Sequence, residues 1–147
     1  MKSIEDAILL AVEVHRGQKD KGGLPYILHP LEVMGLMKTH TAKMVAVLHD
    51  VVEDSDYTID DLREMDYPPE VVDAVDVLTH RPDESYEAYV RRIRPHPLAR
   101  QVKLADLTNN MDVRRLPELR EKDVERLRRY QRAWRTLNDT EEVPWEA

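Results

Sequence analysis

Apolar residues recur along most of this chain at intervals of three and four positions, which is the spacing of one face of an α-helix. No stretch alternates apolar and polar residues for long enough to predict a half-buried strand. We therefore predict an all-α protein, a bundle of about seven or eight helices. The predicted helices cover residues 4–15, 31–38, 42–54, 59–66, 70–79, 86–93, 98–111 and 121–138.

Capping residues and helix breakers set the predicted boundaries. Ser3 and Thr58 are each followed three positions later by an aspartate, which is close to a capping box at a helix N-terminus. Thr41 caps the third predicted helix, and the glycines and prolines of residues 16–30 indicate a loop before the second. We expect the arginine-rich helix 121–138 to dock on the bundle through an apolar stripe, and the last residues to fray.

Composition and charge narrow the class of protein. A chain of 147 residues with 41% hydrophobic and 35% charged residues is typical of one soluble domain, which we assign to residues 1–147. The absence of cysteine excludes a disulfide scaffold and a thiolate metal site. The net charge of −7 argues against general nucleic-acid binding. No apolar run approaches the roughly 18 residues of a membrane span, and the first residues lack a signal-peptide core, so we expect a cytoplasmic protein.

Residues 46–54 carry four functional side chains within an apolar run that the pattern predicts to be helical: His49, Asp50, Glu53 and Asp54. On a helix, residues four positions apart share a face, so an imidazole and three carboxylates would crowd one stripe. Burying unpaired carboxylates is costly, and a bound metal ion would relieve that cost. The alternative is a surface helix end whose acids face water.

Two more residues extend this group into a candidate metal site. His29 directly precedes Pro30 at a predicted loop-to-helix junction, and Asp106 lies in an otherwise apolar helix. Two imidazoles and two carboxylates form a mixed nitrogen and oxygen set that suits Mn, Fe or Zn better than Ca. A lone buried aspartate such as Asp106 is more often a structural group, and the residues alone leave that alternative open.

Four blocks of the sequence resemble a known family. They are His15-Arg16-Gly17-Gln18, Pro25-Tyr26-Ile27-Leu28-His29-Pro30, Leu48-His49-Asp50-Val51-Val52-Glu53-Asp54 and Lys103-Leu104-Ala105-Asp106. In this order they resemble the hydrolase domain of RelA/SpoT-type proteins, within the HD superfamily of phosphohydrolases, and above all the small stand-alone alarmone hydrolases. The resemblance covers roughly residues 4–115 and implies an HD-domain helical bundle.

The resemblance also implies a reaction and the residues that perform it. The implied metal ligands, which usually bind one Mn²⁺, are His29, His49, Asp50 and Asp106. The implied catalytic acids, which orient and deprotonate the attacking water, are Glu53 and Asp54. The implied substrate-binding residues are Lys21, Tyr26 and Asn110, and we add Lys103 as a cation close to Asp106 in sequence. The implied reaction removes pyrophosphate from the 3′ side of guanosine tetra- or pentaphosphate, so the expected partner is a small nucleotide.

The chain departs from this family where the nucleotide base is expected. The loop that usually reads Arg-Lys-Ser-Gly is Asp20-Lys21-Gly22-Gly23, the usual Arg-Leu-His-Asn is Leu107-Thr108-Asn109-Asn110, and Val113 replaces a threonine. Two alternatives follow. One is the same chemistry on another phosphorylated nucleotide, such as the 2′-phosphate of NADPH or a nucleoside triphosphate, and the other is a non-catalytic module that senses a nucleotide. We expect no synthetase or regulatory domain, because the hydrolase resemblance takes up most of the chain.

Overall fold

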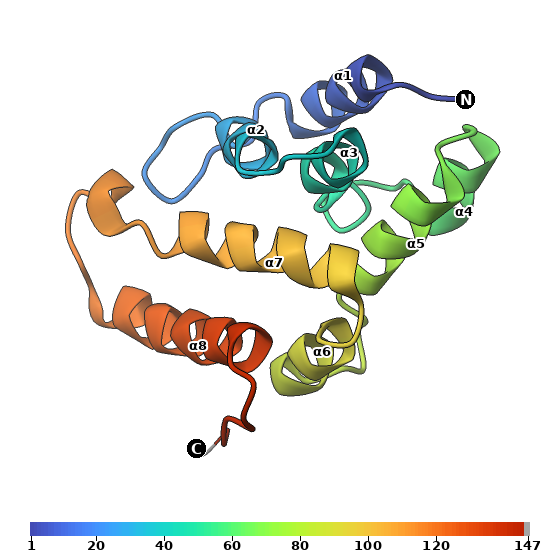
Figure 1. Cartoon of the computed structure of the whole chain (residues 1–147). Helices are drawn as coiled ribbons and strands as arrows, with labels where there is room; N and C mark the ends of the chain where they lie inside the picture. Colours follow the sequence, from blue (N-terminus) through green and yellow to red (C-terminus); the bar gives the residue numbers. More distant parts are fainter. Residues whose placement is uncertain (146–147) are drawn as a thin grey trace.

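The computed structural model describes residues 1–145 and consists of helices joined by loops (Figure 1). Its elements are α1 (Ile4–His15), α2 (Leu28–Gly35), α3 (His40–Leu48), α4 (Ile59–Glu64), α5 (Pro69–Leu78), α6 (Tyr86–Ile93), α7 (Pro97–Asn110), the 3₁₀ helix η1 (Val113–Arg115) and α8 (Glu121–Asn138). Within the described residues, strand-like pairing is limited to one isolated bridge between Lys19 and Pro25. The prediction of an all-α protein with seven or eight helices is confirmed.

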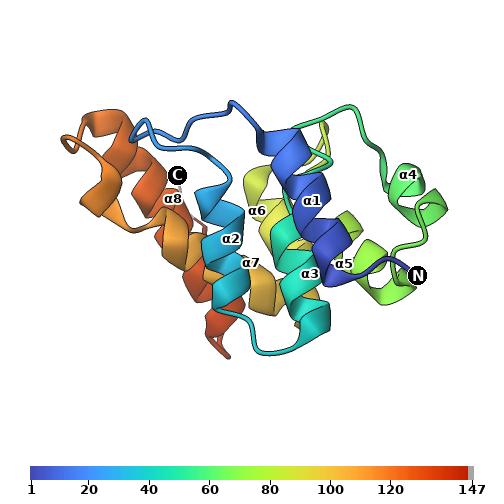
Figure 2. The same cartoon turned by 90° about the horizontal axis from the view of Figure 1, so that it is seen from above.

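Helix α3 lies inside the bundle, where α1, α2, α5 and α7 pack around it (Figures 1 and 2). From Val45 to Leu48 every residue of α3 is fully buried. A helix that is apolar on all sides belongs to the core of a protein rather than to its surface. The polar residues that follow Leu48 are therefore attached to the end of a helix that is packed on every side.

The structure corrects one prediction that concerns the site directly. Helix α3 ends at Leu48, and residues 49–54 form a series of turns instead of continuing the helix. The carbonyl oxygen of Ala46 would accept the N–H of Asp50 in a continued helix. Here it accepts the backbone N–H of His49 at 3.5 Å and the imidazole Nδ1–H of the same residue at 2.5 Å. This local competition from a side chain ends the helix.

Other helix boundaries shift by a few residues. Helix α2 begins at Leu28, so that His29 lies in its first turn and not in the preceding loop. Thr39, rather than Thr41, caps α3 through a hydrogen bond from the N–H of Ala42. The capping boxes expected at Ser3 and Thr58 are both present. The pattern did not predict η1, since three residues are too short to show a period.

The last third of the chain closes the lower side of the bundle in Figure 1, where α8 packs against α7 and α6. Residues 139–145 do not fray as expected, and residues 146–147 lie outside the described part of the chain. Val143 is buried, and its carbonyl oxygen accepts a hydrogen bond from Arg91. The indole N–H of Trp145 donates to the hydroxyl of Thr136. The predicted docking of α8 agrees with the burial of Ala133 and Leu137.

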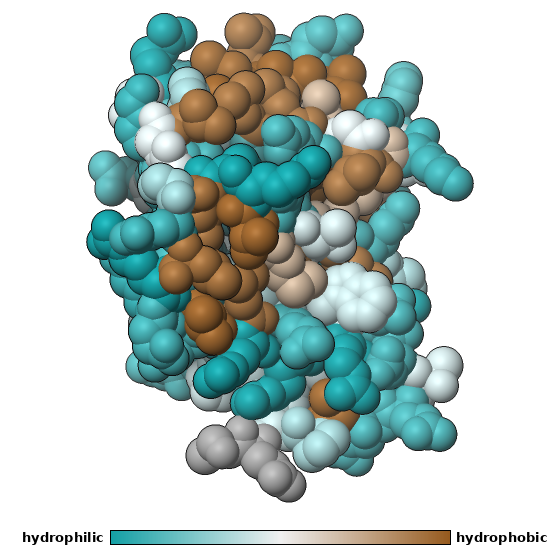
Figure 3. All heavy atoms as spheres, turned by 90° about the vertical axis from the view of Figure 1, so that its left-hand side faces the viewer, coloured by the Kyte–Doolittle hydropathy of each residue, from teal (hydrophilic) through white to brown (hydrophobic). Residues whose placement is uncertain are grey.

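The surface that carries the α1–α2 loop and η1 is mixed in character. Figure 3 shows this side with apolar side chains in separate areas divided by hydrophilic ones. Exposed large apolar residues include Leu24 on the loop, Val113 on η1 and Leu28 at the start of α2. Among the helices of residues 1–145, none is long and apolar enough to cross a membrane.

Candidate metal and nucleotide site

Four predicted ligands from three segments converge at one buried point. His29 comes from the first turn of α2, His49 and Asp50 from the turns after α3, and Asp106 from α7. One potential ligand atom from each of His29, His49 and Asp50 lies within 4.8 Å of the other two. Asp106 Oδ1 lies 2.8 Å from His29 Nε2 and 3.3 Å from His49 Nε2. The structure thus brings together all four residues of the predicted set.

The hydrogen bonds of the two imidazoles determine which nitrogen faces this point. His29 Nδ1 lies 2.7 Å from the amide oxygen of Asn109, and His49 Nδ1 lies 2.5 Å from the carbonyl oxygen of Ala46. Both oxygens only accept, so both Nδ1 atoms carry the proton. The Nε2 lone pairs then point toward the carboxylates of Asp50 and Asp106, an arrangement in which acceptors meet acceptors.

This arrangement fits a divalent cation. His49 Nε2 is buried, and although Asp50 Oδ2 approaches it to 3.0 Å, it makes no hydrogen bond among the described residues. Imidazole nitrogens held by an N–H bond on the far side of the ring, together with carboxylate oxygens, are the usual ligands of Mn, Fe and Zn in proteins. His29, His49, Asp50 and Asp106 could therefore hold a divalent metal.

Electrostatics keep the two carboxylates ionised despite their burial. Burial alone would raise the pKa of Asp50, but in the metal-free protein the positive charge of a protonated His49 outweighs it and lowers that pKa to about 2. Burial also works against ionisation of Asp106, and the Lys103 ammonium and His49 overcome it, so the pKa of Asp106 lies well below its usual value. The same two aspartates raise the pKa of His49 against the opposing effect of burial.

Tyr26 connects the ligand cluster to the solvent side. Its hydroxyl donates to Asp50 Oδ2 at 2.5 Å, and its ring lies between His15 and His29, with centroid distances of 5.0 and 5.7 Å. Burial and the charge of Asp50 raise the pKa of Tyr26, so the phenol remains a proton donor. Tyr26 therefore fixes the orientation of Asp50.

The predicted catalytic acids follow in the turns after Asp50. Glu53 Oε1 accepts the backbone N–H of His80 at 2.5 Å, while Asp54 Oδ2 lies 3.6 Å from Nδ1 of the buried His15. Partial burial and the negative charge of Asp50 raise the pKa of both acids. Both side chains retain contact with solvent. A carboxylate with a raised pKa beside a cluster of charged ligands is suited to accept a proton.

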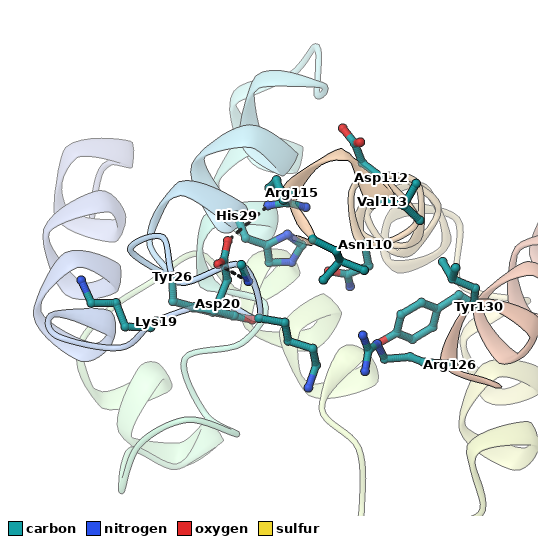
Figure 4. A pocket seen from close by; sticks show the side chains of 14 residues that line it. Lys19, Asp20, Tyr26, His29, Asn110, Asp112, Val113, Arg115, Arg126 and Tyr130 are labelled. Carbon is teal, nitrogen blue, oxygen red and sulfur yellow. Dashed lines mark hydrogen bonds and ion pairs between the residues drawn. The ribbon is translucent and has the colours of Figure 1, made fainter. Parts of the chain in front are cut away.

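A cavity of about 340 Å³ opens beside this cluster (Figure 4). Three of the four predicted substrate-binding residues line it, namely Lys21, Tyr26 and Asn110. His29 forms part of the same wall, so the cavity reaches the ligand cluster. Asn110 also donates to Asp106 Oδ1 at 3.1 Å, which places its amide between ligand and cavity.

Lys103, the fourth predicted substrate-binding residue, is not among the residues that line the cavity. Its ammonium donates to Asp106 Oδ2 at 2.8 Å and lies 5.2 Å from the ring centroid of Tyr89. Burial would lower the pKa of Lys103, but the charge of Asp106 raises it well above its usual value. Lys103 therefore neutralises Asp106, a predicted metal ligand, and does not extend into the cavity.

Apart from Val113, sequence reasoning missed the far wall of the cavity. It is formed by η1 and α8, with Asp112, Val113, Arg115, Leu116, Arg126, Leu127 and Tyr130. Arg126 and Tyr130 are four positions apart and so share a helix face. The four-residue spacing of Arg126 and Tyr130 is visible in the sequence. A tyrosine within an apolar stripe, however, predicts packing against the bundle rather than a binding site. Figure 4 shows Arg126 and Tyr130 facing the cavity from the side opposite Tyr26.

Comparison with known proteins points to a group of relatives. No family model matches the chain. It is 35% identical over 118 residues to a guanosine-3′,5′-bis(diphosphate) 3′-pyrophosphohydrolase of Haemophilus influenzae. This match covers 70% of this chain and 17% of the relative. It is 32% identical over 127 residues to the bifunctional (p)ppGpp synthase/hydrolase SpoT of Escherichia coli, covering 76% and 18%. A GTP pyrophosphokinase of Streptomyces coelicolor is 35% identical over 124 residues, covering 76% and 14%.

This chain is a relative of the RelA/SpoT-type proteins. It spans less than a fifth of the length of each of these three curated relatives, whose matched shares are 14%, 17% and 18%. A solved structure described as a metazoan orthologue of SpoT that hydrolyses ppGpp superimposes with a TM-score of 0.80 at 22% identity, covering 95% of this chain and 88% of that one. The HD-domain helical bundle implied by the RelA/SpoT resemblance is therefore confirmed.

Proposed function

We propose that this chain is a metal-dependent phosphohydrolase that removes pyrophosphate from the 3′ position of guanosine tetra- or pentaphosphate, acting in the cytoplasm as a single domain of residues 1–147. The observation that carries the proposal is the meeting of two imidazole Nε2 atoms with the oxygens of Asp50 and Asp106 at the end of a cation-lined cavity. The activities for which the H. influenzae and E. coli relatives are named support the choice of reaction.

In this proposal His29, His49, Asp50 and Asp106 hold one divalent ion, with Mn²⁺ as the expected metal. When bound, such an ion acidifies a water molecule and polarises a phosphoryl oxygen. The imidazoles supply neutral ligands because their Nδ1–H groups are already committed. The hydroxyl of Tyr26 holds one oxygen of Asp50, which limits the ways in which that carboxylate can turn.

Glu53 and Asp54 handle the proton of the attacking water. Since Glu53 Oε1 is held by the N–H of His80, we assign proton acceptance to Oε2. Burial and the charge of Asp50 raise the pKa of Glu53, which makes it a stronger proton acceptor than an ordinary glutamate. The water oxygen forms a bond to the phosphorus attached to the 3′ oxygen, that P–O bond breaks, and the 3′ oxygen takes up a proton. The products are pyrophosphate and guanosine 5′-diphosphate or 5′-triphosphate.

Cations and one aromatic ring around the cavity match a polyphosphorylated nucleotide. Lys21 and Arg126 can neutralise phosphate oxygens, and the guanidinium fork of Arg126 suits them well. Tyr130 offers a ring face on the wall opposite Tyr26, suited to stacking with a base.

The test begins with metal analysis of protein purified without chelator, followed by assay with Mn²⁺. We expect about one equivalent of metal and release of pyrophosphate from guanosine tetraphosphate. Glu53→Gln should abolish turnover and leave metal content unchanged, because Glu53 is not among the proposed ligands. Absence of stoichiometric metal together with no hydrolysis of any nucleotide polyphosphate would overturn the proposal.

A second candidate keeps the chemistry and changes the nucleotide. Asp20, where relatives carry an arginine, turns its carboxylate into its own loop, and Val113 lines the cavity without a hydroxyl donor. Both features remove polar contacts from the side where a guanine would lie. A panel containing guanosine tetraphosphate, NADPH and nucleoside triphosphates separates the two candidates. A strong preference for guanosine tetraphosphate would exclude the second candidate. If no member of the panel is hydrolysed but one binds, the chain is a nucleotide-sensing module instead.

A further inference from the structure

Asn109 is one of the positions at which this chain departs from its relatives, and its side chain does not face the cavity. Its amide oxygen accepts the Nδ1–H of His29 at 2.7 Å, and its amide nitrogen donates to Glu32 Oε2 at 2.6 Å. The donor to Glu32 fixes which end of the amide is oxygen. Asn109 therefore holds the imidazole of His29 with Nε2 directed at Asp106.

Arg115 binds the same asparagine from the other side. Its Nη2 donates to the backbone oxygen of Asn109 at 2.7 Å and to the amide oxygen at 3.1 Å. Its Nη1 lies 3.8 Å from both Asp20 Oδ2 and Glu32 Oε2. One guanidinium thus joins the partner of His29, on α7, to Asp20 in the loop between α1 and α2. Figure 4 shows Arg115 and Asp20 linked in this way above His29.

The loop of residues 19–24, which we call the rim loop, rests directly on η1. A Cβ atom built on Gly22 would lie 2.3 Å from the carbonyl oxygen of Arg115, so the approach is possible only for glycine. Asp20 Oδ1 accepts the N–H groups of Gly22 and Leu24, both at 2.9 Å, which sets the shape of the loop. Seen from above in Figure 2, this loop extends from α1 to the turn that joins α7 and α8. Asp20, Lys21 and Gly22 all line the cavity.

We propose that Asn109 and Arg115 are positioning residues that couple the rim loop to the orientation of His29, so that metal binding and ordering of the cavity rim support each other. The inference rests on the metal site of the proposed function. Its physical basis is the unbroken chain of contacts from His29 through Asn109 and Arg115 to Asp20. Coupling of this kind is reciprocal: a change in the loop that weakens metal binding must be matched by protection of the loop when metal binds.

The first experiment measures the affinity of metal-free protein for Mn²⁺ by calorimetry, without nucleotide. Asn109→Leu removes the acceptor at similar size and should weaken binding by about 10–100-fold, as loss of outer-shell partners of ligating histidines does. Asn109→Asp keeps the acceptor and should stay within about threefold of the unchanged protein, because the half-exposed Glu32 can turn away. Equal loss in both variants, or no loss in Asn109→Leu, would overturn the role of Asn109.

The second experiment tests the link to the loop. Arg115→Ala should weaken Mn²⁺ binding by about fivefold or more, whereas its neighbour Arg114, 87% exposed and paired with Asp112, serves as the matched control and should have no effect when changed to alanine. Gly22→Ala should also weaken binding because the added methyl pushes the loop away from Arg115. Gly35→Ala on α2, where an added Cβ meets nothing within 4 Å, is its control.

Hydrogen exchange of the Gly22 and Leu24 amides gives the reciprocal measurement. Adding Mn²⁺ should slow exchange in the unchanged protein and leave it unaffected in Arg115→Ala. If Mn²⁺ protects the loop equally in both, the coupling does not run through Arg115 and the proposal fails. None of these measurements uses turnover, so an inactive protein with intact coupling would refute the proposed function alone. An active protein with unchanged affinities in all variants would refute the coupling alone.

Discussion

Replacement of Lys103 by methionine tests whether burial gives the Lys103–Asp106 pair its importance. The side chains are only 12% and 5% exposed, and the ammonium lies 2.8 Å from Asp106 Oδ2. Methionine keeps most of the length and the apolar character of the side chain, but it removes the ammonium that pairs with Asp106 and lies over the ring of Tyr89. Removing one partner of a buried ion pair costs about 3–5 kcal/mol, because the remaining charge is desolvated and uncompensated. We expect a loss of that size in the free energy of unfolding of the metal-free protein.

A bound divalent cation would supply much of the missing positive charge at Asp106. The destabilisation by Lys103→Met should therefore shrink when unfolding is repeated with saturating Mn²⁺. The assay is urea unfolding followed by circular dichroism, with and without metal, for both proteins. The four unfolding free energies separate the contribution of the ammonium from that of the metal.

A matched control is available on the surface. Arg63 and Asp60 are also three residues apart in a helix and also 2.8 Å from each other, but their side chains are 50% and 84% exposed. Exposed pairs contribute roughly 0–1 kcal/mol, so Arg63→Met should change stability by that amount at most. If Lys103→Met and Arg63→Met cost the same, or if Mn²⁺ fails to reduce the cost at Lys103, then the reasoning about Asp106 is refuted.

Three further predictions follow from the same geometry. Glu53→Gln should lower kcat by at least about 100-fold, as loss of a general base does, with unchanged metal content by elemental analysis; turnover near the original rate would exclude Glu53 as the base. Arg126→Ala should raise KM for the nucleotide about tenfold or more, as expected on loss of a charged hydrogen bond of roughly 1.5–3 kcal/mol, while the exposed Arg128→Ala on the same helix should not. Hydrogen bonds from Arg92 lower the pKa of Glu84 to about 2 in the folded protein. Ionised Glu84 therefore stabilises the fold at pH values above its pKa in the unfolded chain, and this stabilisation is lost as the pH falls through its pKa in the folded protein. Unfolding free energies between pH 5 and about 2 should therefore fall less steeply in Glu84→Gln, and equal slopes would contradict this.

The sequence predicted the helices and the grouping of His29, His49, Asp50 and Asp106 more successfully than it predicted the contacts that hold these side chains in place. Helix α3 is apolar in every position from Val45 to Leu48, a pattern typical of an element that is packed on all sides. Where the helix ends was decided by His49, whose side chain competes for the Ala46 carbonyl. A ligand histidine and a helix-ending histidine look the same in a sequence, so the turns of residues 49–54 could not be foreseen.

Lys103 and Arg115 show a second limit of the sequence. Lys103 precedes Asp106 by three positions, and this spacing is equally compatible with a cation that reaches substrate and one that neutralises its neighbour. Burial decides between them, and burial of Lys103 depends on Tyr89 from another helix. Arg115 contacts Asp20, which lies 95 positions earlier in the sequence, and no local sequence pattern predicts this contact. Such contacts are set by tertiary packing, which no helical period records.

Two departures of the rim loop from the family pattern, Asp20 and Gly22, fit the close approach of η1 in this structure. An arginine at position 20 would bring a second guanidinium against Arg115, and a serine at position 22 would place its Cβ 2.3 Å from the carbonyl oxygen of Arg115. Asp20 and Gly22 therefore both accommodate the close approach of η1 to the loop. Restoring the family residue at either position alone should disrupt the loop and leave nucleotide preference unimproved. Any change of preference by mutation has to alter the loop and η1 together.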